Sequence, residues 1–283
     1  MEQLTAFLTD WKIPVGKTAK TVFDWLNAHA SVVFNAISKV MESLIAGILW
    51  LLELPHPLIF TLIIVVLTWA LQRNWKVCLL VALGFIFILN QGYWDETMQS
   101  LTLVLSACVV CMVVGVPIGI AAAHRPTLYA WMRPVLDLMQ TLPTFVYLIP
   151  AIVFFGIGMV PGLIATVIFV LPAPVRLTYL GISSTPASLV EAAKSFGATP
   201  RQLLWKVELP SAMPQIMAGM NQTIMLSLSM VVIAALVGAS GLGVPVVRAL
   251  NSVNTALGFE SGIIIVVVAI MLDRILRVGK QDD

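Results

Sequence analysis

Long apolar stretches recur along this chain, and most have the length of a helix that crosses a lipid bilayer. The bilayer core is about 30 Å thick, so a spanning helix needs about 20 residues and must satisfy its own backbone hydrogen bonds. The pattern therefore predicts an all-α, polytopic integral membrane protein. Eight candidate spans lie near residues 36–52, 57–71, 76–90, 98–123, 135–155, 160–180, 213–238 and 259–277.

Basic residues alternate between the connections and predict which side of the membrane each connection faces. Connections that contain Arg or Lys lie near residues 72–76, 124–134 and 176–206. Connections without either lie at 53–57, 92–97 and 156–162. Because Lys and Arg favour the cytoplasmic side, the first set should face the cytoplasm. The alternation holds only if the first candidate crosses, although Lys39 and Glu42 make it the weakest, so we expect eight crossings with both termini in the cytoplasm.

Composition agrees with a membrane protein and narrows the partner classes. The 283 residues are 59% hydrophobic and 11% charged, which is more apolar surface than one soluble core could bury. Sixteen basic and 14 acidic residues give a net charge of +2 without a basic stripe, so nucleic acid is not expected as a partner. Cys78, Cys108 and Cys111 fall inside apolar runs, where they are typical of packing residues, and no metal or cofactor is expected.

Two regions of the chain differ in how often proline interrupts their apolar runs. Residues 1–91 hold an amphipathic start and three candidate spans, whereas residues 92–283 hold five spans interrupted by prolines. Proline in a spanning helix is tolerated where neighbours or cavity water satisfy the freed carbonyl. We therefore interpret the first region as a scaffold and the second as the part that forms a pathway. The prolines are Pro117, Pro143, Pro150, Pro172 and Pro174.

The stretch EAAKSFGATPRQLLWKVELP, residues 191–210, is too polar to cross a bilayer yet is regularly patterned. Thr185 as N-cap and Pro186 as first helical residue predict a short helix, which Gly197 would end in a left-handed conformation. Residues at positions i, i+3, i+4 and i+7 of this helix predict one apolar stripe. The stripe consists of Leu189, Ala192, Ala193 and Phe196.

A second short helix should follow directly. Thr199, Pro200 and Gln202 form a capping-box pattern, and Pro210 is expected to end the helix. Two helices of about ten residues are too short to span and are marginal alone, so their apolar faces need a docking surface. That surface is either a cytoplasmic partner or the chain's own spans, which the pair would cover at the interface.

The spacing in this stretch resembles a known motif. The stretch contains Glu191-Ala192-Ala193, three residues, Gly197, nine residues, Val207, one residue and Leu209-Pro210. This spacing is similar to the EAA loop of permease subunits in binding-protein-dependent ABC importers. Residues 137–162, 171–182 and 218–243 resemble the glycine betaine, proline and choline branch of that family.

The resemblance implies a MetI-like five-helix permease core preceded by about three N-terminal helices, in the bacterial cytoplasmic (inner) membrane. It implies a homodimer that works with two copies of a separate ATPase and an extracytoplasmic substrate-binding protein. The imported substrate would be a quaternary ammonium osmoprotectant such as glycine betaine, choline or proline betaine. The coupling loop at about 185–210 would contact the ATPase, through Glu191, Ala192, Ala193, Gly197, Leu209 and Pro210.

The chain is not expected to be an enzyme. Gly16-Lys17-Thr18 resembles the end of a phosphate-binding loop, but Trp11 stands where that loop needs its first glycine. ATP hydrolysis is therefore assigned to a separate chain. The alternative function is an ion-gradient-driven secondary transporter of small zwitterions or cations, which predicts buried charges or broken inverted repeats.

Polar residues within candidate spans predict a translocation path or hydrogen bonds between helices. Gly115 and Gly119 predict close helix packing. Arg133 and Asp137 are four residues apart and predict an ion pair. Residues 238–243 predict a tight external turn or a gate. The path candidates are Gln140, Thr144 and Tyr147 on one span and Asn221, Gln222 and Ser227 on another.

Overall fold

The computed structural model describes residues 14–276, and every regular element in that range is helical. The chain termini and Trp11, on which predictions were made, lie outside the described residues. The elements are α2 (Val15–Glu53), α3 (Pro57–Gln72), α4 (Trp75–Gln91), α5 (Trp94–Ala123), α6 (Pro126–Thr141), α7 (Thr144–Phe155), α8 (Met159–Val170), α9 (Pro172–Ser183), α10 (Ala187–Ser195), α11 (Pro200–Leu203), η1 (Leu204–Glu208), α12 (Leu209–Ala235), α13 (Gly243–Ser252) and α14 (Thr255–Leu276).

The described helices confirm an all-α polytopic membrane protein. Five helical segments are long and apolar enough to cross a bilayer: Gly16–Glu53, Trp94–Ala123, Met159–Ser183, Pro200–Ala235 and Thr255–Leu276. The predicted span at 135–155 is instead split into α6 and α7, which bend by 97°, and this pair would make a sixth span. The apolar helices α3 and α4 have 16 and 17 residues, so the count of eight crossings stays a prediction.

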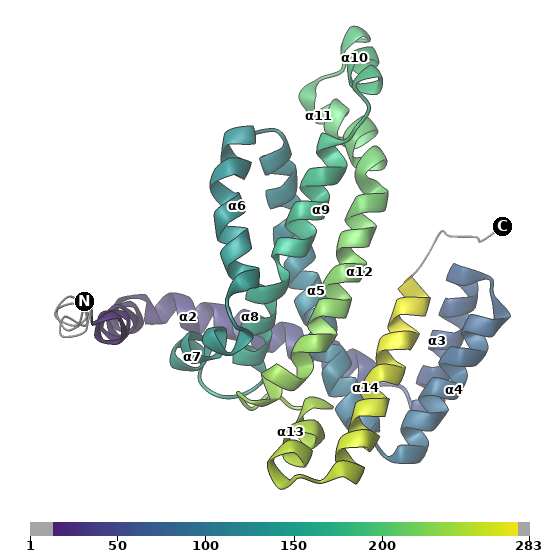
Figure 1. The fold of residues 1–283 in the computed structure, drawn as a ribbon. Helices are drawn as coiled ribbons and strands as arrows, with labels where there is room; N and C mark the ends of the chain where they lie inside the picture. Colours follow the sequence, from purple (N-terminus) through teal and green to yellow (C-terminus); the bar gives the residue numbers. More distant parts are fainter. Residues whose placement is uncertain (1–13, 277–283) are drawn as a thin grey trace, which may run out of the picture.

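Helices α5, α9 and α12 pack closely at the centre of the bundle (Figure 1). A Cβ atom added at Gly119 of α5 would lie 2.7 Å from both the Val175 carbonyl oxygen and the Thr178 Cβ of α9. One added at Gly115 would lie 2.9 Å from Pro174. The predicted close-packing role of the two glycines is thus confirmed.

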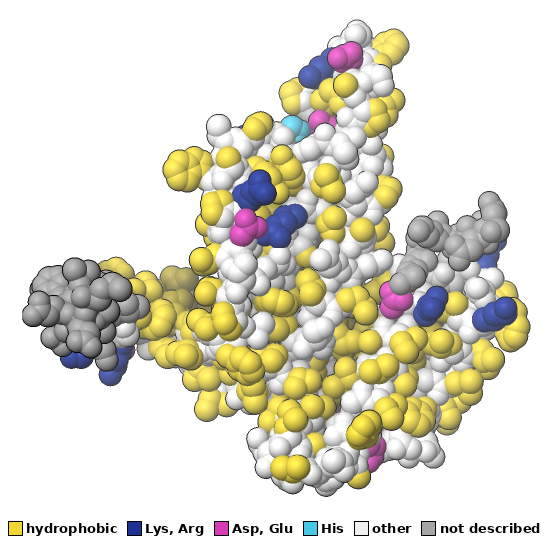
Figure 2. All heavy atoms as spheres, viewed as in Figure 1, with side chains coloured by type: hydrophobic (Ala, Val, Ile, Leu, Met, Phe, Trp, Pro, Cys, Tyr) yellow, Lys and Arg dark blue, Asp and Glu magenta, His cyan; other side chains and the backbone are white. Residues whose placement is uncertain are grey.

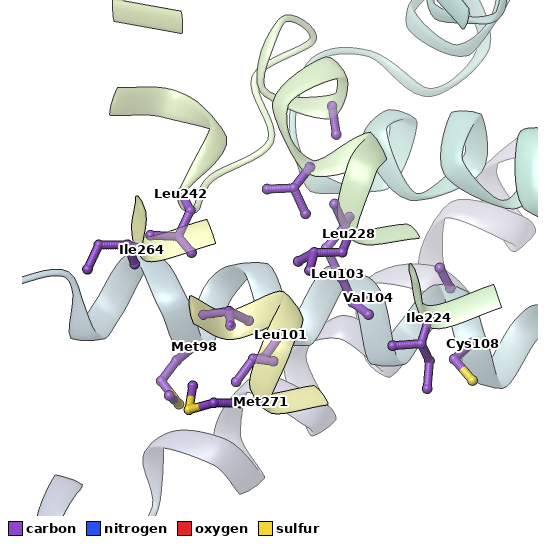
Figure 3. Close-up of a cluster of buried hydrophobic side chains, with 14 of the residues drawn as sticks. Met98, Leu101, Leu103, Val104, Cys108, Ile224, Leu228, Leu242, Ile264 and Met271 are labelled. Carbon is purple, nitrogen blue, oxygen red and sulfur yellow. The ribbon is translucent and has the colours of Figure 1, made fainter. Parts of the chain in front are cut away.

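A hydrophobic cluster joins this centre to the C-terminal helix. Figure 3 shows side chains of α5, α12 and α14 pointing toward one another around Leu242, which precedes α13. All of them are buried, so the cluster fixes α14 against the long helix α5. The labelled side chains are Met98, Leu101, Leu103, Val104, Cys108, Ile224, Leu228, Leu242, Ile264 and Met271.

The first described helix, α2, runs crosswise to α5, α9 and α12 (Figure 1). The candidate span at 36–52 is the second half of this 39-residue helix. Phe34 stacks on Phe154 of α7 with ring centroids 4.4 Å apart and meets Phe155 edge-on. Aromatic packing therefore ties α2 to the short helix that follows the bend.

The GASGLG stretch forms the predicted tight turn, between α12 and α13. Gly238 and Gly241 have φ angles of +87° and +124°, which favour glycine. The Leu242 N–H donates to the buried Ser100 Oγ of α5 at 2.8 Å. The turn is thereby anchored to the first core helix.

Figure 2 shows hydrophobic side chains covering most of the lower half of this face, as a lipid-exposed surface requires. Charged side chains lie on the projecting tip, on the upper part of the same face and at mid-height on the right, beside α14, α3 and α4, and one acidic group lies near the bottom. This division agrees with the predicted separation of basic connections from apolar spans.

Replacing Gly119 tests the helix contact. Gly119→Val forces α5 away from the α9 backbone, and we expect the free energy of unfolding in detergent to fall by about 1–3 kcal/mol. The control is Gly47→Val in α2, because a Cβ at Gly47 meets nothing within 4 Å. Equal losses in a denaturant titration of the two variants would contradict close packing at Gly119.

Candidate coupling site

The coupling segment, defined here as residues 185–210, projects from one end of the bundle (Figure 1). It connects the C-terminus of α9 to the N-terminus of α12 and contains α10, α11 and η1. Since α9 and α12 are both core helices, the segment is mounted on the core at both of its ends.

The first helix of the segment, α10, begins differently from the prediction. Thr185 was expected as the N-cap, but Pro186 occupies the cap position and no side chain caps the helix. The Thr185 N–H donates to the Ile182 carbonyl at 3.2 Å, which keeps Thr185 in the last turn of α9. Its hydroxyl is buried and has no hydrogen-bond partner within residues 14–276.

The end of α10 is as predicted. Gly197 has a φ angle of +78°, and its N–H donates to the Lys194 carbonyl at 2.9 Å. The Ala198 N–H donates to the Ala193 carbonyl at 3.0 Å, so the last carbonyls of the helix are satisfied. Gly197 is therefore the hinge between the two short helices.

The start of α11 is also as predicted. The Gln202 N–H donates to Thr199 Oγ1 at 3.3 Å, and the Thr199 N–H donates to Gln202 Oε1 at 2.9 Å. These reciprocal bonds form a complete capping box.

Pro210 does not end the second helix, contrary to the prediction. The π-helical turn η1 shifts the hydrogen-bond pattern by one residue, and the Leu209 N–H donates to the Leu204 carbonyl. Because the wider turn accommodates the proline that follows it, α11 runs through η1 into the 27-residue α12. The second half of the segment is thus continuous with a core helix.

The expected coupling residues fall into two groups. Glu191, Ala192 and Gly197 are exposed on the projecting tip, and Ala193 beside them is half-buried. Leu209 and Pro210 lie at the other end of the segment, where α12 begins.

The apolar stripe of α10 is uncovered. Phe196 is 93% exposed, Leu189 is half exposed, and no residue of α10 is buried. Trp205 of η1 is exposed as well. Within residues 14–276 the stripe therefore does not cover the spans, and docking on a separate partner stays a prediction.

The first group of path candidates stabilises the bend between α6 and α7. Gln140 Oε1 accepts a hydrogen bond from Arg176 of α9 at 2.7 Å. The Tyr147 hydroxyl donates to the backbone carbonyl of Met139, across the bend, and Thr144 is half-buried at the start of α7.

The expected ion pair between Arg133 and Asp137 is wrong. Asp137 Oδ1 instead lies 2.6 Å from Arg176 Nη2, because α9 packs beside α6 and brings a closer cation. In the sequence, Arg176 serves only to assign its connection to the cytoplasmic side. Its position within an apolar run indicates that it has a specific partner.

The second group of path candidates lies on α12. Asn221 Nδ2 donates to the Leu276 carbonyl of α14 at 3.4 Å, whereas Asn221 Oδ1 and Ser227 Oγ are buried with no hydrogen-bond partner among the described residues. Gln222 is exposed. The observed hydrogen bonds thus connect one group to α9 and the other to α14.

A further contact was missed from the sequence. Glu208 of η1 faces His124, the residue that ends α5, with 2.9 Å between Oε2 and Nε2. Nothing in the spacing of two residues 84 positions apart could have indicated this pair.

Comparison with known proteins defines the family. Residues 115–278, more than half of the chain, match the family described as the binding-protein-dependent transport system inner membrane component. The chain belongs to this permease family. ATP hydrolysis in such a transporter is the work of a separate subunit, and the permease is a multi-pass protein of the bacterial inner membrane.

Several curated proteins are similar to this permease over most of its length. It is 46% identical over 266 residues to the glycine betaine transport system permease protein OpuAB of Bacillus subtilis, covering 94% of each chain. It is 47% identical over 247 residues to the glycine betaine/carnitine transport permease protein GbuB of Listeria monocytogenes, covering 86% of this chain and 88% of that one. It is 43% identical over 272 residues to the glycine betaine/proline betaine transport system permease protein ProW of Escherichia coli, covering 95% of this chain and 76% of that one.

A solved structure has the same fold. The permease matches a chain of the inward-facing MetNI methionine ABC transporter with a TM-score of 0.58 and 23% identity, over 69% of its own length and 98% of that chain. The expected MetI-like architecture is thus confirmed at the level of the fold.

The hinge can be tested by two replacements of Gly197. Gly197→Val places a β-branched residue in the left-handed region at a cost of about 1–2 kcal/mol, and amide exchange in α10 should rise about tenfold. Gly197→Asn should raise it far less, since Asn tolerates this conformation. The expected cost is conformational and not steric, because a Cβ at Gly197 meets nothing within 4 Å. Equal exchange in both variants would show that the backbone does not need this conformation.

Proposed function

We propose that this permease imports quaternary ammonium osmoprotectants, such as glycine betaine, choline or proline betaine. The names and the 43–47% identity of OpuAB, GbuB and ProW support this substrate class. The high-affinity site for the substrate belongs to the extracytoplasmic binding protein. The permease provides the path, with Gln140, Thr144 and Tyr147 from one helix pair and Asn221, Gln222 and Ser227 from α12.

The coupling segment docks on the ATPase subunit in this proposal. The proposal rests on the exposed stripe of α10. An apolar face with Phe196 at its end lies on a short helix that has no buried residue. Small side chains at Ala192 and Ala193 allow close approach, and Glu191 offers a charge to a basic group of the ATPase. Leu209 and Pro210 join the docked helices to α12.

The working assembly is a homodimer of the permease with two ATPase chains and one extracytoplasmic binding protein. A face of α12 supports a second copy, since exposed residues recur on it at helical spacing. They are Ala218, Gln222, Met225 and Ser229.

The topology in this assembly has eight crossings and both termini in the cytoplasm. Residues 1–91 act as a scaffold, and residues 92–283 form the permease core. ATP binding closes the ATPase pair, draws the two coupling segments together and turns the cavity outward, and hydrolysis resets it. The continuity of η1 with α12 supports transmission along this route.

Two variants test the docking role. Glu191→Ala and Phe196→Ala should insert normally, but the permease should bind its ATPase at least about tenfold more weakly and lose coupled uptake. Ser188→Ala, at another exposed position of α10, serves as the control. Unchanged ATPase affinity of both variants in nanodiscs would rule out docking through this face.

Uptake measurements test the substrate and the energy source. Cells with the complete system should accumulate radiolabelled betaine or choline, lose uptake on ATP depletion and keep it with an uncoupler. The isolated permease should bind betaine poorly, and a micromolar dissociation constant without partner chains would contradict this. Loss of uptake with the uncoupler alone would favour a gradient-driven transporter.

A further inference from the structure

A single charged side chain lies buried at the joint between the coupling segment and the core. Among residues 14–276, Glu208 is the only charged residue in the buried class, at 7% exposure. It occupies the last position of η1, where the π-helical turn passes into α12. Position 208 is not part of the EAA spacing, so the coupling motif itself does not account for it.

Glu208 has one polar partner, and that partner belongs to another core helix. His124 ends α5, and its Nδ1 lies 2.9 Å from the Ile120 carbonyl while its Nε2 lies 2.9 Å from Glu208 Oε2. The carbonyl can only accept, so Nδ1 donates. The contact between Nε2 and Glu208 Oε2 then needs a second proton, held by one of these two atoms.

The residues around Glu208 and His124 are mostly apolar, so this pair is the polar contact between the end of α5 and the coupling segment. Apolar residues flank it: Ile182, Ala212 and Ile216 form a buried cluster, with Ile120, Ala123, Leu204 and Leu209 against it. An apolar groove of about 930 Å³, lined partly by the same residues, lies between the last turns of α5, η1 and the start of α12. The Glu208 side chain is 10% exposed and the His124 side chain 45% exposed, so the carboxylate is buried while the histidine faces solvent. Among the described residues, no other side-chain hydrogen bond joins the end of α5 to the coupling segment.

We propose that Glu208 and His124 are positioning residues that transmit movement of the coupling segment to α5. The inference rests on the proposed docking of that segment on the ATPase. Movement of α10 passes through the Gly197 hinge to α11, which is continuous with η1 and α12, and reaches the end of α5 through this pair. Without the pair, the ATPase still docks and hydrolyses ATP, and α5 keeps its packing on α9 and α12, but the end of α5 no longer follows η1.

The test uses the importer reconstituted in proteoliposomes with its ATPase and binding protein. The measured quantity is ATP hydrolysed per betaine molecule imported. Glu208→Ala and His124→Ala should each raise this ratio about tenfold, and the double variant should be no worse than either single variant. Glu208→Gln keeps a hydrogen-bonding group facing His124 and should raise the ratio only about threefold. The control is Glu53→Gln, an exposed carboxylate at the end of α2.

The outcomes separate this inference from the docking proposal. Additive effects of the two alanine variants, or ratios equal to wild type, would overturn the link. If the alanine variants do not accumulate in the membrane, Glu208→Gln and His124→Gln decide, and unchanged ratios in both overturn it. Glu191→Ala is measured in parallel: normal coupling there defeats the docking proposal, whereas altered coupling there with normal coupling at Glu208 defeats only the link.

Discussion

The close contact of α5, α9 and α12 is the constraint on which the rest of this permease depends. Lipid offers no hydrophobic force between helices, so small residues that let backbones approach must hold them together. Gly119 meets the α9 backbone, and Gly181 of α9 meets Ala212 and Gln215 of α12, each within about 3 Å of an added Cβ. Because the coupling segment connects two of these three helices, their packing fixes where it projects.

Irregular backbone in the permease occurs where neighbouring groups can accommodate it. The bend of 97° between α6 and α7 is braced by Tyr147 and by the contacts of Arg176 with Gln140 and Asp137. The proline after η1 is absorbed by a π-helical turn rather than by a break. A membrane protein can therefore keep its prolines and still deliver a rigid connection from the coupling segment to the core.

Local features of the site were predictable from the sequence, and distant partners were not. The left-handed Gly197 and the capping box at Thr199 depend on a few adjacent residues, which is why their pattern sufficed. Asp137 pairs with Arg176, 39 residues away, and Glu208 with His124, 84 residues away, because helix packing brings them together. Thr185 failed as a cap for a local reason, since its N–H bonds to the Ile182 carbonyl and continues the last turn of α9. Hydrophobic patterning gave the helices but not their directions, so it did not reveal that α2 lies crosswise.

The central claim is that the hinged coupling segment lies in the cytoplasm against the ATPase. The most direct measurement is labelling of Ser188→Cys, an exposed position of α10, with a membrane-impermeant maleimide; the native cysteines are buried. The account predicts no labelling in intact cells, labelling in inside-out vesicles stripped of the ATPase, and protection when the ATPase is restored. Labelling from the outside of intact cells would contradict it.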